Sequence, residues 1–371
     1  MLAIERRYDI DWIRVIAIGL LLIYHIAIGF QSWGIMIGFI TNEQSWETLW
    51  IPMSLLNVWR IPLLFFVSGM GVYFAIQKRN WKQLMLERAS RIFIPLLFGI
   101  FFIVPVHIYL LQDYYMQALS YTFNMGHLWF LGNICAYIVI LSPIFIYLKN
   151  NEEGRLVRGI KGMLSSPLGL IPFILAYMAE AWIIAPGLYT MYAMTWHGFV
   201  LGLLAFFFGY CFVLSGPLFW NMILKWRGLF LLAGALLFVL RFIMFQLNAT
   251  GYLLALESIC WIITVFAFGY RYLNKPGRVL TYLSQAAYPV YIVHMMFLYL
   301  GSYLIFPLSL PVPLKFVIVL AFTFIGCFLC YDLIRRVNWL RPVFGLKRSN
   351  KGFVGPSDIR NILPSQAVKA G

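Results

Sequence analysis

The chain has 371 residues, of which 62% are hydrophobic and only 11% are charged, yet its formal net charge is +15. A soluble chain is typically about 45–50% apolar and about 25% charged, so the composition excludes a soluble enzyme, a disordered protein and a secreted disulfide scaffold. It predicts an all-α polytopic membrane protein. The excess of basic residues would indicate a nucleic-acid partner, unless membrane topology accounts for these charges.

Ten apolar runs are long enough to cross a bilayer as helices. In chain order they are 12–31, 52–76, 91–112, 127–148, 167–186, 197–214, 228–246, 251–270, 279–302 and 312–334. The first follows Arg6 and Arg7 and lacks a small-residue cleavage site, which predicts an uncleaved anchor. We expect residues 1–345 to form one membrane domain and residues 346–371 a short polar cytoplasmic tail.

The basic residues alternate with the predicted helices. Of the 28 Lys and Arg residues, 24 lie before the first helix, in every second loop or in the tail. The intervening loops contain none, and these are 32–51, 113–126, 187–196, 247–250 and 303–311. By the positive-inside rule both termini are cytoplasmic. The charge is therefore explained by topology, which removes nucleic acid as a partner and predicts an integral protein of a bacterial inner or cell membrane.

All five cysteines fall within the predicted spans. Cys327 and Cys330 form a single C-x-x-C without a second pair, so we interpret them as packing residues and predict no metal site. No permanently bound cofactor is expected either.

Ionisable residues inside the spans are costly and by default mark a functional site. They are Arg14, His25, Arg60, His107, Glu180, Arg241, Glu257 and His294, with His127 and His197 at outer helix starts. At about 1.5 Å per residue, four of them reach similar depths in the middle and outer half of the membrane, namely His25, Arg60, Glu257 and His294. This shared depth predicts a polar cavity that opens outward.

Arg14 and His25 lie eleven residues apart in the first helix, so they share one face about 16 Å apart along its axis. Such a face suits an anionic ligand that enters from the cytoplasm with its reactive end at His25. Asp11, three residues before Arg14, can pair with it. In the alternative interpretation, Asp11 and Arg14 only anchor the helix at the interface.

Arg88 and Arg91 lie at the cytoplasmic entry to the third helix. Two arginines three residues apart suit bidentate capture of phosphates, although arginines at this depth also extend to lipid headgroups. At the outer face, His127 and Trp129 open the fourth helix, and Trp129 alternatively belongs to the interfacial aromatic belt. Tyr291 and His294 are one turn apart, so phenol and imidazole can act on one substrate.

These motifs together resemble the acyltransferase-3 family of integral-membrane O-acyltransferases, and within it the glucan biosynthesis protein C-like (succinyltransferase) branch. The resemblance covers residues 9 to about 334. It rests on Asp11-x-x-Arg14, the R-x10-H from Arg14 to His25, Phe65–Gly69 after Arg60, Arg88-x-x-Arg91 with Pro95, His127–Leu131, and Tyr288–His294. Other branches carry a fused hydrolase-like periplasmic domain, which we do not expect in this chain.

The resemblance implies transfer of an acyl group, acetyl or succinyl, from cytoplasmic acyl-CoA to a hydroxyl of an extracytoplasmic glycan or glycolipid. Arg14, Arg88 and Arg91 would bind the acyl-CoA, and His127, Trp129 and His294 would line the acceptor site. We expect neutral His25 to be the general base or, alternatively, a transient acyl carrier.

Two catalytic roles remain, the residue that orients His25 and the group that stabilises the oxyanion. We expect Glu257 to orient the His25 imidazole, as a carboxylate does in hydrolytic triads. Arg60 or Tyr291 would stabilise the oxyanion of the tetrahedral intermediate.

Two other functions compete with the enzyme. A solute transporter also uses intramembrane acids, histidines and arginines, but it typically shows two corresponding halves, which this sequence lacks. A non-catalytic lipid- or glycan-binding protein of an envelope assembly predicts that His25→Ala leaves acylation intact.

Overall fold

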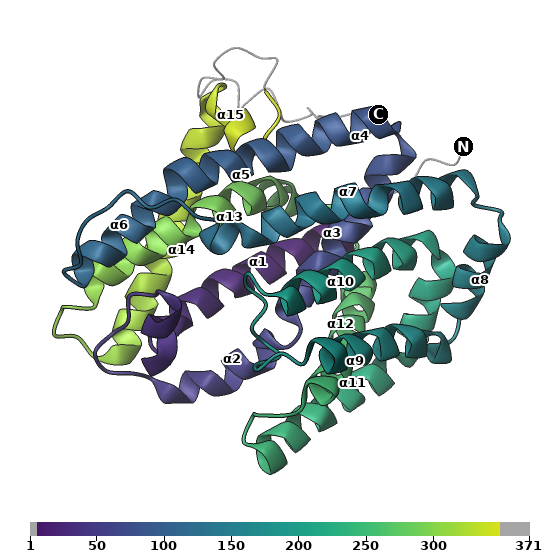
Figure 1. Ribbon diagram of the computed structural model, residues 1–371, viewed down its shortest axis with the longest axis horizontal. Helices are drawn as coiled ribbons and strands as arrows, with labels where there is room; N and C mark the ends of the chain where they lie inside the picture. Colours follow the sequence, from purple (N-terminus) through teal and green to yellow (C-terminus); the bar gives the residue numbers. More distant parts are fainter. Residues whose placement is uncertain (1–5, 349–371) are drawn as a thin grey trace, which may run out of the picture.

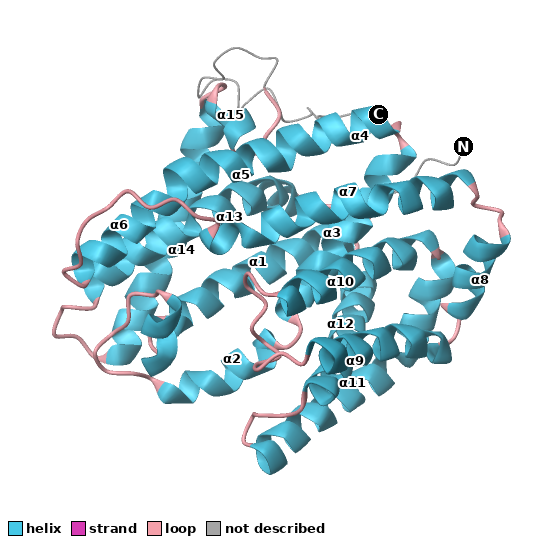
Figure 2. Cartoon of the chain, viewed as in Figure 1, coloured by secondary structure: helices cyan, strands magenta, loops and turns pink. Residues whose placement is uncertain are grey.

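The computed structural model describes residues 6–348, and the regular structure within that range is entirely helical (Figures 1 and 2). Most of the predicted tail, residues 349–371, lies outside the described residues.

Within residues 6–348, ten helical segments are long and apolar enough to cross a membrane, as the sequence predicted. They are α1 (Tyr8–Ile28), α2 (Trp50–Asn57) with α3 (Arg60–Gln77), a composite of α4 (Trp81–Arg88), α5 (Ile94–Phe98) and α6 (Val104–Tyr114), α7 (Trp129–Asn150), α9 (Ile171–Ile184), α10 (Trp196–Leu214), α11 (Pro217–Phe245), α12 (Gly251–Tyr272), α13 (Arg278–Ile305) and α14 (Val312–Arg336). Two short helices, α8 (Arg155–Met163) and α15 (Leu340–Val343), lie between or after the spans.

The third and seventh spans begin about ten residues earlier than predicted, at Trp81 and Pro217. The first eleven residues of the third span include Lys82 and Arg88, and those of the seventh span include Lys225 and Arg227. An apolar run stops at such residues, but the helix itself continues because its charged side chains reach the membrane interface.

The composite third span contains two five-residue π-helical turns, Ala89–Phe93 and Gly99–Ile103, on either side of α5. Pro95 lies between them and cannot donate a helical hydrogen bond. Such π-turns rotate the following residues and occur often at functional sites. Arg91 belongs to the first of them, at the predicted cytoplasmic entry.

α1 lies in the interior of the bundle, where it packs against α3, α12, α13 and α14 (Figure 1). The closest helix pair is α3 with α10. A Cβ atom on Gly69 would overlap the backbone of Phe206, and one on Gly209 would overlap that of Phe66. Small residues at such positions let two membrane helices approach each other. α1 therefore carries its side chains into a rigid surrounding framework.

The second span is interrupted at Val58 and Trp59, so that α3 begins inside the bundle with Arg60 as its first residue. The carbonyl group of Val58 accepts a hydrogen bond from the Tyr192 hydroxyl at 3.1 Å. Burial raises the pKa of the Tyr192 phenol well above its usual range, which keeps this donor protonated. The interruption thus brings Arg60 and the loop before α10 to one place.

Candidate functional site

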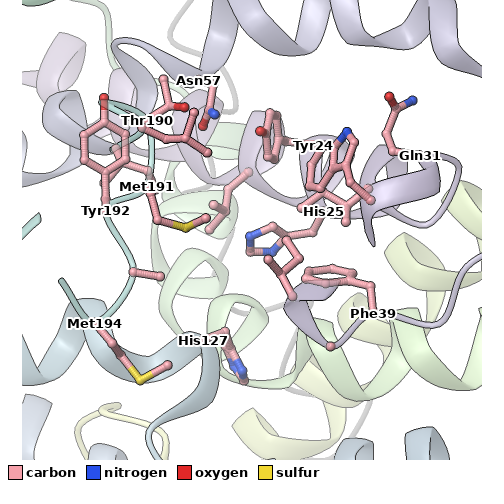
Figure 3. Close-up of a pocket in the computed structure, with 18 of the residues that line it drawn as sticks. Tyr24, His25, Gln31, Phe39, Asn57, His127, Thr190, Met191, Tyr192 and Met194 are labelled. Atoms are coloured by element: carbon pink, nitrogen blue, oxygen red, sulfur yellow. The ribbon is translucent and has the colours of Figure 1, made fainter. Parts of the chain in front are cut away.

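A cavity of about 1230 Å³ lies at the end of the bundle whose loops contain no Lys or Arg. Its walls come from α1, α2, α3, α6, the start of α7 and the loop at 187–194. His25 lies near the centre of Figure 3, between Met191 of this loop and Phe39 of the first outer loop. The cavity is larger than the roughly 300–1,000 Å³ of typical small-molecule sites, so it has room for part of a glycan chain.

His25 and His294 form a hydrogen-bonded pair. Nδ1 of His25 lies 2.9 Å from Nε2 of His294, and the rings are nearly parallel at 12°. His294 is fully buried and its Nδ1 lies 2.6 Å from the carbonyl oxygen of Tyr291. A carbonyl only accepts, so Nδ1 of His294 carries a hydrogen and Nε2 of the neutral ring is left to accept.

This arrangement fixes the tautomer of His25. Nδ1 of His25 must donate to Nε2 of His294, so in the neutral ring the lone pair lies on Nε2. His25 is a cavity-lining and partly exposed residue, and Nε2 has no hydrogen-bond partner among residues 6–348. The structure therefore presents an oriented, unoccupied proton acceptor to the cavity.

The predicted pairing of Glu257 with His25 is wrong. Both carboxylate oxygens of Glu257 accept from Arg241, Oε2 from Nε at 2.8 Å and Oε1 from Nη2 at 3.0 Å. Nη2 of Arg241 also donates to the carbonyl of Ser54 at 3.2 Å. Equal depth did not imply contact, because Glu257 on α12 faces α11. The position beside His25 that we assigned to Glu257 is occupied by His294.

His294 also differs from its predicted place. It does not line the cavity, and both of its ring nitrogens are engaged within the protein. It consequently cannot contact an acceptor in this conformation, and its position suits a residue that orients His25.

Tyr291 and His127 hold the start of α7 against α13. The Tyr291 hydroxyl donates to the carbonyl of His127, and Nε2 of His127 donates to the carbonyl of Ile292 at 3.0 Å. The Tyr291 proton is thus used within the protein, which removes the phenol as the predicted oxyanion donor. Since Nε2 of His127 donates, its Nδ1 carries the lone pair, and this buried atom has no partner in the described chain.

Trp129 and His107 complete this wall of the cavity. The Trp129 ring lies 6.1 Å from that of Phe65, and Trp129 lines the cavity as predicted. His107 was noted in the sequence but given no role, and its ring lies 5.5 Å from that of His127. No group of three His, Cys, Asp or Glu residues in the described part of the chain is arranged to hold a metal ion.

Arg60 lines the cavity but is only 2% exposed. Its guanidinium carbon lies 3.8 Å from the centre of the Tyr24 ring. Nε and Nη1 have no hydrogen-bond partner, and Arg60 takes part in none of the ion pairs within residues 6–348. It is a buried cation at the cavity wall, and two of its nitrogens have no partner within residues 6–348.

Three arginines gather at the opposite end of α1. Nη2 of Arg88 donates to the carbonyl of Gly71 at 3.3 Å, and a Cβ atom on Gly71 would lie 3.7 Å from Nη2 of Arg14. Arg14 also pairs with Asp11 at 3.4 Å, and Arg91 with Glu87 at 3.5 Å. Arg14 and Arg88 thus converge on one glycine of α3, so they can contact one anionic ligand.

Another buried imidazole, that of His197, lies outside this arrangement. Its Nδ1 is 2.8 Å from Glu180 and its Nε2 is 2.6 Å from the carbonyl of Tyr189. Its ring stacks on Tyr192 with 21° between the planes. His197 and Glu180 therefore fix the loop that lines the cavity and leave no ring nitrogen free.

The acyltransferase-3 family, described as an acyltransferase domain, matches residues 7–332. The chain belongs to this family. It is a membrane acyltransferase with ten apolar helices, and the match extends from the start of α1 almost to the end of α14. No curated protein and no solved structure matches the chain.

Proposed function

We propose that this acyltransferase moves an acetyl or succinyl group from cytoplasmic acyl-CoA to a hydroxyl of an extracytoplasmic glycan or glycolipid, with His25 as general base. The observation that carries the proposal is the free Nε2 of His25, oriented by His294 and open to the cavity. A sugar hydroxyl is a weak nucleophile at neutral pH, so a positioned base is what the reaction requires.

In the chemical step, Nε2 of His25 first accepts a proton and then donates it. As the hydroxyl oxygen bonds to the thioester carbonyl carbon, its proton moves to Nε2. The hydrogen bond from Nδ1 to His294 strengthens as the His25 ring becomes cationic. When the C–S bond breaks, Nε2 returns the proton to the thiolate, which yields free CoA thiol and an ester. The alternative, in which Nε2 itself carries the acyl group, uses the same geometry.

Arg60 is the remaining candidate for the oxyanion, since Tyr291 is engaged elsewhere. We assign acyl-CoA binding to Arg14, Arg88 and Arg91, whose charges lie at the predicted cytoplasmic end of the bundle. Acceptor binding falls to Trp129, which offers an aromatic face, and to His127, which lines the same cavity. Glu257 instead holds Arg241 in the cavity wall.

Topology and family branch complete the proposal. With both termini in the cytoplasm, the cavity faces the outside of a bacterial inner or cell membrane. We place the chain nearest the glucan biosynthesis protein C-like branch, with acyl-CoA as a co-substrate and no permanent cofactor.

The decisive experiment measures acyl esters on surface glycans by mass spectrometry in cells that carry His25→Ala, Arg14→Ala or the control Arg227→Ala. Arg227 is an arginine on α11 whose side chain, within residues 6–348, donates to the carbonyl of Leu224 in its own helix. We expect ester loss in the first variant, reduction in the second and no change in the control. Unchanged esters in His25→Ala would contradict the proposal.

Two further measurements separate the alternatives. A burst of CoA thiol from purified protein without acceptor, together with labelled protein, would identify His25 as an acyl carrier. A reporter fused after Gly371 must report the cytoplasm, and a periplasmic signal would overturn the topology.

A further inference from the structure

Arg60 lacks the partners that other buried cations of this chain possess. Arg241 has Glu257, and Nζ of Lys315 donates to Asn42 and to a backbone carbonyl. Both of these cations are satisfied within the protein. Arg60 has no such partner among residues 6–348 and packs on the face of Tyr24, although it is as buried as Arg241.

An unpaired cation at this depth is costly to maintain. A buried charge is normally compensated by an ion pair and hydrogen bonds, and breaking such a pair is strongly destabilising. This uncompensated charge favours an anion in the part of the cavity next to Arg60.

The oxyanion alone does not account for this arrangement. Its charge exists only during attack, whereas the guanidinium is charged throughout the catalytic cycle. A permanent anion on a bound substrate compensates the cation in the ground state as well. A guanidinium carries five N–H donors on two edges, so a permanent anion on one edge leaves donors for the oxyanion on another.

We propose that Arg60 is the subsite for a carboxylate carried by a substrate, so that the cavity selects an acidic substrate over a neutral one. The choice of substrates in this proposal rests on the proposed acyl transfer. Its test measures binding alone and does not depend on acyl transfer. The carboxylate has two sources: the far end of a dicarboxylic acyl group, or an acidic sugar of the acceptor. Asn57 and Tyr192, which line the same cavity, are uncharged, and the carboxylate in its lining belongs to the exposed Glu47, thirteen residues before Arg60.

The test measures binding without turnover. Protein carrying His25→Ala is reconstituted in nanodiscs and titrated with succinate, glucuronate or glucose at constant ionic strength. The readout is thermal stabilisation. We expect one or both carboxylates, but not glucose, to stabilise the protein. Arg60→Gln in the same background should weaken that binding about 10- to 100-fold.

The outcomes assign the source. Stabilisation by succinate alone places the carboxylate on the acyl group, stabilisation by glucuronate alone places it on the acceptor, and stabilisation by both supports the subsite. In the last case, turnover of succinyl-CoA with a neutral glycan is compared with that of acetyl-CoA and an acidic glycan. Absence of stabilisation by either, or equal stabilisation in Arg60→Gln, overturns the proposal.

Two controls keep the result interpretable. Lys315→Gln removes a buried cation that does not line the cavity and should leave carboxylate binding unchanged. Arg60→Met removes an uncompensated charge and should melt no lower than the parent without ligand. A markedly lower melting temperature for Arg60→Met would show that the cation is structural. A protein that binds carboxylate through Arg60 but never transfers acyl groups contradicts only the proposed function.

Discussion

Two histidines within residues 6–348 are hydrogen-bonded to another side chain through Nδ1, and their difference separates a reactive site from a structural one. His25 is bonded to His294 at 2.9 Å and His197 to Glu180 at 2.8 Å. The other nitrogen of His197 is bound to the carbonyl of Tyr189, whereas that of His25 faces the cavity. A side-chain partner on Nδ1 is therefore common to both histidines, whereas the partial exposure and the free lone pair distinguish His25 from the buried His197.

The comparison also changes the expected roles of the partners. Glu180 is a carboxylate beside an imidazole, which resembles the orienting acid of hydrolytic triads, but its histidine has no free nitrogen with which to act on a substrate. His294 is a neutral partner, yet it leaves the useful nitrogen of His25 open. Identification of the base thus depends on counting donors and acceptors rather than on charge.

The largest expected effect follows from removing the free nitrogen itself. His25→Ala should lower the rate of acyl transfer by about 10³-fold or more, because the base and the proton return are lost together. The measurement is CoA thiol release by purified protein, with size-exclusion behaviour as the check on folding. A well-folded His25→Ala protein that keeps a tenth of the wild-type rate would remove His25 from the mechanism.

A smaller loss is expected when only the orienting partner is removed. His294→Phe should lower kcat about 10²-fold with little change in KM, because the Nδ1 hydrogen of His25 loses its acceptor and the tautomer is no longer fixed. His294→Gln can offer a side-chain oxygen to Nδ1 and should recover part of the loss.

A double variant tests whether the two histidines act as one unit. His25→Ala combined with His294→Phe should be no slower than His25→Ala alone, since residues that act together are not additive. Fully additive losses would assign His294 a role that is independent of His25.

The arginines assigned to acyl-CoA binding should affect the affinity for acyl-CoA instead of the chemical step. Arg88→Gln, and separately Arg14→Gln, should raise KM for acyl-CoA about tenfold, because a charge-assisted hydrogen bond to a phosphate is lost. KM for the acceptor should stay the same, and higher salt should diminish the difference. Arg227→Gln is the matched control. If both single variants and their combination retain the wild-type KM for acyl-CoA, the phosphates bind elsewhere.

The sequence predicted the ten spans because each apolar run must satisfy its backbone as a helix. Depth along those helices also brought His25 and Arg60 to one level, and the structure has both in one cavity. Depth does not specify direction around a helix axis. Glu257 and His294 lie at similar predicted depths, but α13 presents His294 to His25 while α12 turns Glu257 toward Arg241.

Backbone partners were equally invisible in the sequence. The carbonyls of Tyr291 and Ile292 set the tautomers of His294 and His127, and carbonyls have no sequence signature. The seven uncharged residues at 188–194, with tyrosines at 189 and 192, did offer a signal for a cavity wall. Their folding against His197 depends on contacts between distant elements, which spacing alone does not specify.

The smallest effect on the rate of acyl transfer should come from changing the pair of Glu180 and His197, in which both ring nitrogens are already hydrogen-bonded. Glu180→Gln leaves the His25 site intact, so kcat well below the melting temperature should stay within about twofold of wild type. Weakening the buried hydrogen bond between Glu180 and His197 should instead lower the free energy of unfolding by about 1–3 kcal/mol. The affected loop lines the cavity, so KM for the acceptor should rise a few-fold while KM for acyl-CoA does not. Thermal unfolding and separate titration of the two substrates measure these effects.

The contradicting outcome is a loss of kcat comparable to that of His294→Phe in Glu180→Gln protein that melts like wild type. It would show that the pair of Glu180 and His197 takes part in catalysis, and the distinction between His25 and His197 would no longer hold.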